Sequence, residues 1–113
     1  MDSRVEEFKR IAQERWEYLR YGNASKGNKC YDKMREIYFD LKKDGLLAEL
    51  ATLLTDEDDG VKFEAAQNLL PDFTEGSKRA LSEIAPKMGL LAFEAKETLK
   101  WWNKKEKSQA EEI

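Results

Sequence analysis

Residues 53–70, LLTDEDDGVKFEAAQNLL, decide the fold. A Leu-Leu pair is followed by four acidic residues and then by Gly60, where a helical pattern begins. In that pattern Val61, Ala65 and Leu69 recur every four residues, which places them on one buried face of a helix. Side-chain oxygens and negative charge both favour the start of a helix, so the acidic run predicts a turn between two helices.

The same pattern recurs further along the chain. Residues 62–69 (KFEAAQNL) and 92–99 (AFEAKETL) share Phe, Glu, Ala and Leu at an offset of 30. The segments that precede them, 47–51 (LAELA) and 81–85 (LSEIA), align at an offset of 34. A single helical hairpin cannot bury its apolar face alone, so a hairpin that recurs at this spacing predicts stacked neighbours.

The run from Leu53 through the acidic turn to Val61, Ala65 and Leu69 resembles a repeat of the HEAT/armadillo-like superfamily. The second copy departs from it, because residues 89–91 (GLL) replace the acidic turn and Lys96 replaces the second Ala. Taken whole, the chain is similar to a small bacterial family of HEAT-like proteins of unassigned function. The resemblance implies an all-α fold, an α-α superhelix of five to six helices, in which the second helix of each hairpin lines the concave side.

The rest of the chain completes one domain. Residues 1–45 predict two longer helices that cap one end of the hairpins, separated by a loop at residues 22–28 (GNASKGN). Residues 46–102 supply the two HEAT-like hairpins, with Trp102 on the core stripe of the last helix. We therefore expect a single HEAT-like domain over residues 1–103, and we expect the charged segment 104–113 to be a frayed tail.

Composition excludes several classes of function. The chain has 20 Lys and Arg against 23 Asp and Glu, a net charge of −3, whereas general nucleic-acid binders are normally basic. It has no histidine, and its single cysteine, Cys30, therefore has no histidine to activate it. The acidic run lacks the spacing of a calcium loop, and no Gly-rich phosphate loop is present. We therefore predict no enzymatic activity, no metal and no cofactor.

The sequence also suggests where the protein resides. The polar N-terminus lacks the apolar segment of a signal peptide, and no apolar run approaches the length of about 18 residues that spans a membrane. A single cysteine fits a reducing compartment. We expect a cytoplasmic protein without a membrane segment.

Candidate binding residues lie opposite the predicted buried faces of the two repeat helices. At about 100° per residue, each of these opposite faces carries a Phe-Glu pair. The predicted partner-binding residues are Phe63, Glu64, Gln67, Phe93, Glu94, Glu97 and Trp101. Aromatic anchors with a polar rim are typical of protein interfaces. The alternative is that Phe63 and Phe93 pack between neighbouring hairpins, whereas Trp101 is expected at the rim or the surface because Trp102 already occupies the core stripe.

These features favour a non-catalytic protein–protein interaction module, in one form a small bacterial immunity protein that binds and neutralises a toxin. Residues 1–55 hold 11 Lys and Arg against 10 Asp and Glu (+1), whereas residues 56–113 hold 9 against 13 (−4). A basic partner would be steered toward the second half, unless the acidic run only caps a helix. Nucleic-acid binding through Lys26, Lys29 and Lys33 with Tyr31 is an alternative, and homo-oligomerisation through the unfinished end of a short solenoid is another.

Overall fold

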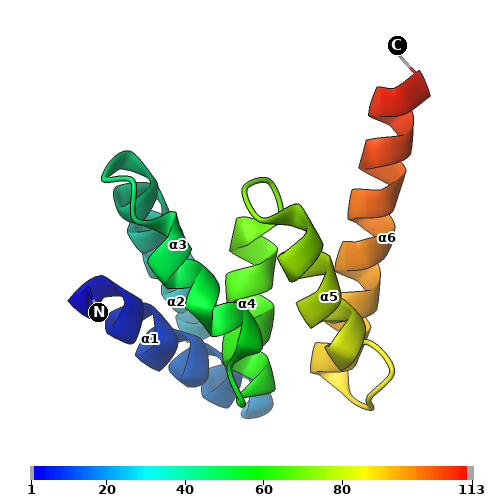
Figure 1. Ribbon diagram of the computed structural model, residues 1–113. Helices are drawn as coiled ribbons and strands as arrows, with labels where there is room; N and C mark the ends of the chain where they lie inside the picture. Colours follow the sequence, from blue (N-terminus) through cyan, green and yellow to red (C-terminus); the bar gives the residue numbers. More distant parts are fainter. Residues whose placement is uncertain (1, 112–113) are drawn as a thin grey trace.

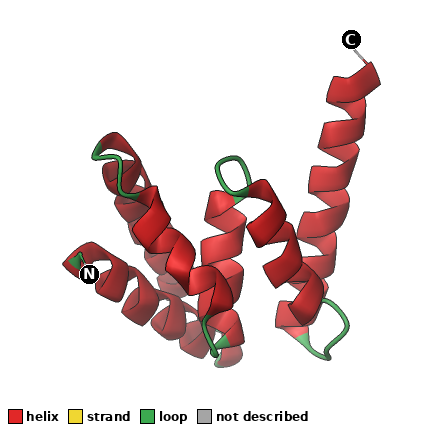
Figure 2. Cartoon of the chain, in the orientation of Figure 1, coloured by secondary structure: helices red, strands yellow, loops and turns green. Residues whose placement is uncertain are grey.

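The computed structural model describes residues 2–111, which form an all-helical chain without strands (Figures 1 and 2). This confirms the all-α fold with five to six helices. The helices are α1 (Ser3–Arg20), α2 (Ala24–Lys43), α3 (Leu47–Leu50), the 3-10 helix η1 (Ala51–Thr55), α4 (Asp59–Leu69), α5 (Thr74–Ile84) and α6 (Leu90–Glu111). Because α3 is a single turn that continues directly into η1, the two together act as one short helical segment.

Local chemistry sets the helix boundaries. The side chain of Asp2 caps α1 by accepting a hydrogen bond from the backbone N–H of Arg4 at 2.9 Å. The hydrogen bonds from Arg4 lower the pKa of Asp2 to about 2. Helices α1 and α2 are followed by Gly22 (φ 77°) and Gly45 (φ 73°), which adopt the left-handed backbone that ends a helix and that side chains disfavour.

Successive helices alternate in direction, so that α2, α4 and α6 run the same way and α1, the α3–η1 segment and α5 run the opposite way (Figure 1). Three hairpins result: α1 with α2, α3–η1 with α4, and α5 with α6. The superhelical arrangement that the HEAT resemblance implies stays a prediction.

One hydrophobic cluster runs through all three hairpins. It joins side chains of the first two helices to those of the repeat helices, including Val5, Phe8, Met34, Leu41, Leu50, Val61, Leu69, Leu81 and Ile84. Burial of this cluster is the main source of stability, because apolar surface removed from water is the dominant favourable term in folding. The side chains of Val61, Ala65 and Leu69 are fully buried, as their spacing predicts.

The prediction of a frayed tail is wrong for the part of segment 104–113 that the structure describes. Helix α6 continues to Glu111, and residues 112–113 lie outside the described residues. Lys78 on α5 forms an ion pair with Glu106 at 3.0 Å, which attaches this extension to the body and lowers the pKa of Glu106. None of the helices in residues 2–111 is both long and apolar enough to cross a membrane.

Candidate binding groove

Helix α4 is enclosed on most sides, and this overturns part of the predicted binding surface. Phe63 is only 2% exposed and Glu64 is fully buried, so neither side chain lies on an open face. The Phe63 ring packs edge-on against the Trp16 ring of α1, with the ring centroids 5.7 Å apart. The alternative prediction, that the Phe residue packs between hairpins, is therefore confirmed for Phe63.

Glu64 is buried because α1 supplies its partners. Its Oε2 atom forms an ion pair with the Arg15 guanidinium and accepts a hydrogen bond from Trp16 Nε1 at 2.8 Å. Burial raises the pKa of Glu64, although Arg15 and Trp16 act in the opposite direction. The other carboxylate oxygen, Oε1, is buried and has no hydrogen-bond partner among the described residues.

Beside this buried pair, a groove opens between α2 and α6, with the end of α4 as its floor. Its volume is about 310 Å³. Five of the eleven residues of the lining are aromatic. The lining consists of Tyr31, Arg35, Tyr38, Phe39, Gln67, Asn68, Leu70, Pro71, Trp101, Trp102 and Lys105. The two charged residues of the lining, Arg35 and Lys105, are both cationic, and Tyr38 of the lining donates a hydrogen bond to the carboxylate of Asp72.

Arg35 in the wall of this groove contacts Asn68 and two aromatic rings. It donates a hydrogen bond from Nη1 to Asn68 Oδ1 at 2.8 Å. Its guanidinium also lies 4.8 Å from the ring centroid of Phe39 and 5.0 Å from that of Tyr38. Such stacking on aromatic faces orients a guanidinium and leaves its edge open to an anion.

Lys105 lies on the opposite wall, on α6. Its ammonium lies 5.1 Å from the ring centroid of Trp101 and 5.4 Å from that of Trp102. Among the residues that the structure describes, neither Arg35 nor Lys105 has a carboxylate within ion-pair distance. The groove therefore presents two cations without an internal counter-ion.

The structure brings only two of the seven predicted binding residues to this groove, Gln67 and Trp101. Trp101 is 58% exposed, as expected for a rim residue, and Trp102 is partly buried against the core. Phe93 is 56% exposed, but it does not line the groove, and neither do the two predicted carboxylates of α6, Glu94 and Glu97.

Sequence reasoning missed the contribution of α2. Arg35 and Phe39 are four residues apart on that helix, as are Trp101 and Lys105 on α6. Pairing of a cation with an aromatic residue at this spacing puts the two side chains on one face of a helix. The same cation–aromatic spacing on two different helices was the signal in the sequence that could have located the groove.

The residues of the nucleic-acid alternative do not form one site. Lys29 and Lys33 line a separate cavity next to α1, with Arg10 and Cys30, whereas Tyr31 lines the groove. Lys33 is also 4.0 Å from Glu7. Tyr31 thus lies on a different side of α2 from Lys29 and Lys33, so the predicted surface does not include Tyr31, and nucleic-acid binding stays a prediction.

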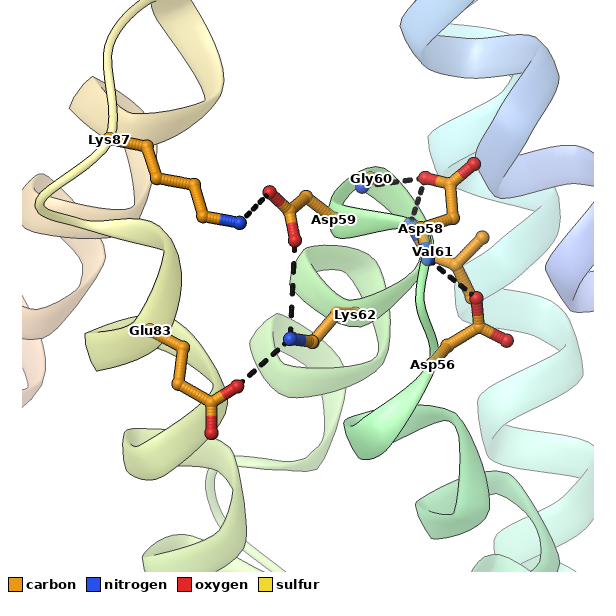
Figure 3. Close-up of polar contacts among 8 residues, drawn as sticks. All are labelled: Asp56, Asp58, Asp59, Gly60, Val61, Lys62, Glu83 and Lys87. Carbon is orange, nitrogen blue, oxygen red and sulfur yellow. Dashed lines mark hydrogen bonds and ion pairs between the residues drawn. The ribbon is translucent and has the colours of Figure 1, made fainter.

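The acidic turn is occupied by contacts within the protein (Figure 3). Asp58 caps α4 by accepting hydrogen bonds from the backbone N–H groups of Gly60 at 2.8 Å and Val61 at 3.2 Å. Asp59 pairs with Lys87 at 2.6 Å. Lys9 lies 3.0 Å from Asp56, which raises the pKa of that lysine. The capping alternative is therefore confirmed, and three of the four carboxylates expected to steer a basic partner already have internal partners.

Comparison with protein-family models finds no match, and comparisons with curated proteins and with solved structures find none either. The HEAT resemblance and the functions that it implies therefore stay predictions. Among the described residues, no three or more His, Cys, Asp or Glu side chains are placed so that they could hold a metal ion together.

Proposed function

We propose that this protein is a non-catalytic module that binds a segment of a partner protein in the groove between α2 and α6. The observation that carries the proposal is the pair of exposed aromatic side chains on the two walls, Phe39 (53% exposed) and Trp101 (58% exposed), each beside a cation. Large aromatic side chains dominate the binding energy of protein interfaces when they become buried.

The framework around the groove supports this function. The helical walls carry the aromatic side chains on rigid elements, and Asn68 on the floor holds Arg35 in place. A preorganised site loses little conformational entropy when a partner binds. The immunity role is one form of the proposal, in which the partner is a toxin that the groove engages.

Affinity capture from an extract of the native cells tests the proposal. The bait is the full chain, and the test variant carries Phe39→Ala and Trp101→Ala together. The control variant carries Tyr21→Ala, since Tyr21 is 76% exposed and does not line the groove. Far-UV circular dichroism establishes that each bait is folded.

We expect a protein that is enriched by the wild type and by the Tyr21 variant, and that is lost from the double variant. Equal enrichment by all three baits, or no enrichment under conditions in which a known complex survives, would contradict binding in the groove. Sedimentation of the free chain distinguishes the oligomeric alternative, because a dimer that dissociates in the double variant makes a second copy the occupant.

A further inference from the structure

We infer that the partner segment is acidic and carries an apolar side chain next to its carboxylates. This inference rests on the proposed function, because it names the chemistry of what the groove takes. Carboxylates of the segment would bind Arg35 and Lys105, and the apolar side chain would pack against Phe39 and Trp101.

The charges that line the groove favour an acidic segment. The chain as a whole carries a net charge of −3, yet the charged side chains in the lining of the groove are both cationic. A concave surface with apolar walls strengthens such a local field, because the low dielectric of the walls reduces screening. The groove is thus a site at which this acidic protein attracts an anionic group and repels a basic one.

Hydrogen-bonding groups that remain unused in the groove also favour a protein segment with carboxylates. Arg35 uses one donor on Asn68, and a guanidinium has five N–H donors, so its remaining donors can bind a carboxylate with two parallel hydrogen bonds. On the floor, Gln67 Oε1 is buried and has no hydrogen-bond partner within the described part of the chain. A buried acceptor of this kind is costly to leave unpaired, and a backbone N–H of the bound segment would satisfy it.

A single-stranded nucleic acid is also anionic and can stack on aromatic rings, but the groove suits it less well. Affinity for nucleic acid grows with the number of phosphates that Lys and Arg neutralise, and only two charged side chains line this groove. Lys42, further along α2, is already engaged with Asp72 at 3.3 Å. A protein segment needs only one or two carboxylates to use both cations.

Fluorescence polarisation with defined probes tests the inference on the full chain. The probe is a short fluorescein-labelled peptide of alternating glutamate and phenylalanine. Two further probes represent other kinds of ligand. The same peptide with lysine in place of glutamate represents a basic segment, and a short labelled oligothymidylate represents a single-stranded nucleic acid. The test variants are Arg35→Glu, Lys105→Glu and their combination. The matched control reverses one charge on each of the same helices, Lys29→Glu with Lys96→Glu, at exposed residues that do not line the groove.

We expect the acidic peptide to bind the wild type and the control, with affinity that falls as salt rises. Each single reversal should raise Kd about tenfold, and the combination about a hundredfold, as loss of charge-assisted hydrogen bonds implies. The inference is overturned if the lysine peptide binds as well as the acidic one, or if charge reversal leaves Kd unchanged. Tighter binding of oligothymidylate than of the acidic peptide would replace it with nucleic-acid binding.

The two proposals fail in different ways. If no acidic probe binds while capture from extract still depends on Phe39 and Trp101, the chemistry of the segment is wrong but the interaction module stands. If capture does not depend on those two residues, the proposed function itself fails.

Discussion

Replacement of Glu64 by alanine should destabilise the protein by about 2–4 kcal/mol, although this residue occupies a position that the repeat pattern predicts to be exposed. The substitution leaves the Trp16 indole N–H without an acceptor and separates Arg15 from its counter-ion. Breaking a buried ion pair costs about 3–5 kcal/mol, and an unsatisfied buried donor costs about 1–3 kcal/mol. The expected cost of Glu64→Ala is lower than the sum of these two values, because the Arg15 side chain is 17% exposed and can turn toward water.

The pH dependence provides a second measurement on the same residue. Burial raises the pKa of Glu64 in the folded state, so the folded protein binds more protons than the unfolded chain between the two pKa values. The part of the stability that comes from this pKa shift is therefore complete below the unfolded pKa of about 4.3 and is lost as pH rises through the folded pKa. The contacts with Arg15 and Trp16, which Glu64→Ala removes, are a separate contribution. The free energy of unfolding of the wild type, relative to that of Glu64→Gln, should therefore fall over that interval, because glutamine does not titrate.

Urea unfolding followed by far-UV circular dichroism measures both the stability lost in Glu64→Ala and the change of stability with pH. Subtracting the free energy of unfolding of Glu64→Gln from that of the wild type cancels the contribution of other carboxylates, such as Asp2. Glu97→Ala is the matched control, since the side chain of Glu97 is 47% exposed and lies 3.5 Å from Lys100. An exposed pair of this kind contributes less than about 0.5 kcal/mol. A cost of Glu64→Ala no larger than that of Glu97→Ala would contradict the buried contacts of Glu64. A free energy of unfolding of the wild type that rises with pH relative to that of Glu64→Gln would contradict the raised pKa.

Substitutions at three further residues test the packing and capping of α4. Leu69→Ala should cost about 2–5 kcal/mol in chemical denaturation, because the side chain is fully buried; a loss below about 1 kcal/mol would place Leu69 outside the core. Asp58→Ala should lower the free energy of unfolding by about 1 kcal/mol, because the cap of α4 is lost. Asp58→Ser should lower it much less, because serine also caps a helix. Equal losses of stability in the two variants would argue against capping. Gly60→Ala should lower the melting temperature despite the better helix propensity of alanine, because the added Cβ would lie 2.9 Å from Trp16 Cδ1. A higher melting temperature would mean that the indole moves aside at little cost.

The repeat in the sequence predicts the helices well but not the surroundings of its two copies. Phe63 and Phe93 occupy equivalent positions, yet one is buried and the other is 56% exposed. The difference arises from the preceding hairpins. The long helix α1 brings Trp16 onto Phe63, whereas the short segment that ends at Thr55 contains no tryptophan that could cover Phe93 in the same way.

On an enclosed helix such as α4, the polarity of a residue does not predict that its side chain is exposed, and Glu64 is an example. A glutamate in a helical pattern normally marks the solvent side, and the spacing of Val61, Ala65 and Leu69 also predicts an exposed Glu64. Here one oxygen of the carboxylate pairs with Arg15, which lies 49 residues earlier in the chain. No local pattern reports such a partner. The acidic turn, by contrast, was predictable as a cap because a capping side chain accepts hydrogen bonds from the next two or three residues.

The ion pair between Arg15 and Glu64 also bears on how the chain folds. Each hairpin closes over a short connection, whereas this pair closes a much longer loop, which costs more chain entropy. Until Arg15 pairs with Glu64, α4 carries an unpaired carboxylate that is costly to bury, so its packing against the first and third hairpins is incomplete. We therefore expect the first hairpin and the repeat hairpins to unfold as one cooperative unit, with coincident transitions by tryptophan fluorescence and circular dichroism. Separate transitions would mean that the hairpins are independent, as in a longer array of repeats.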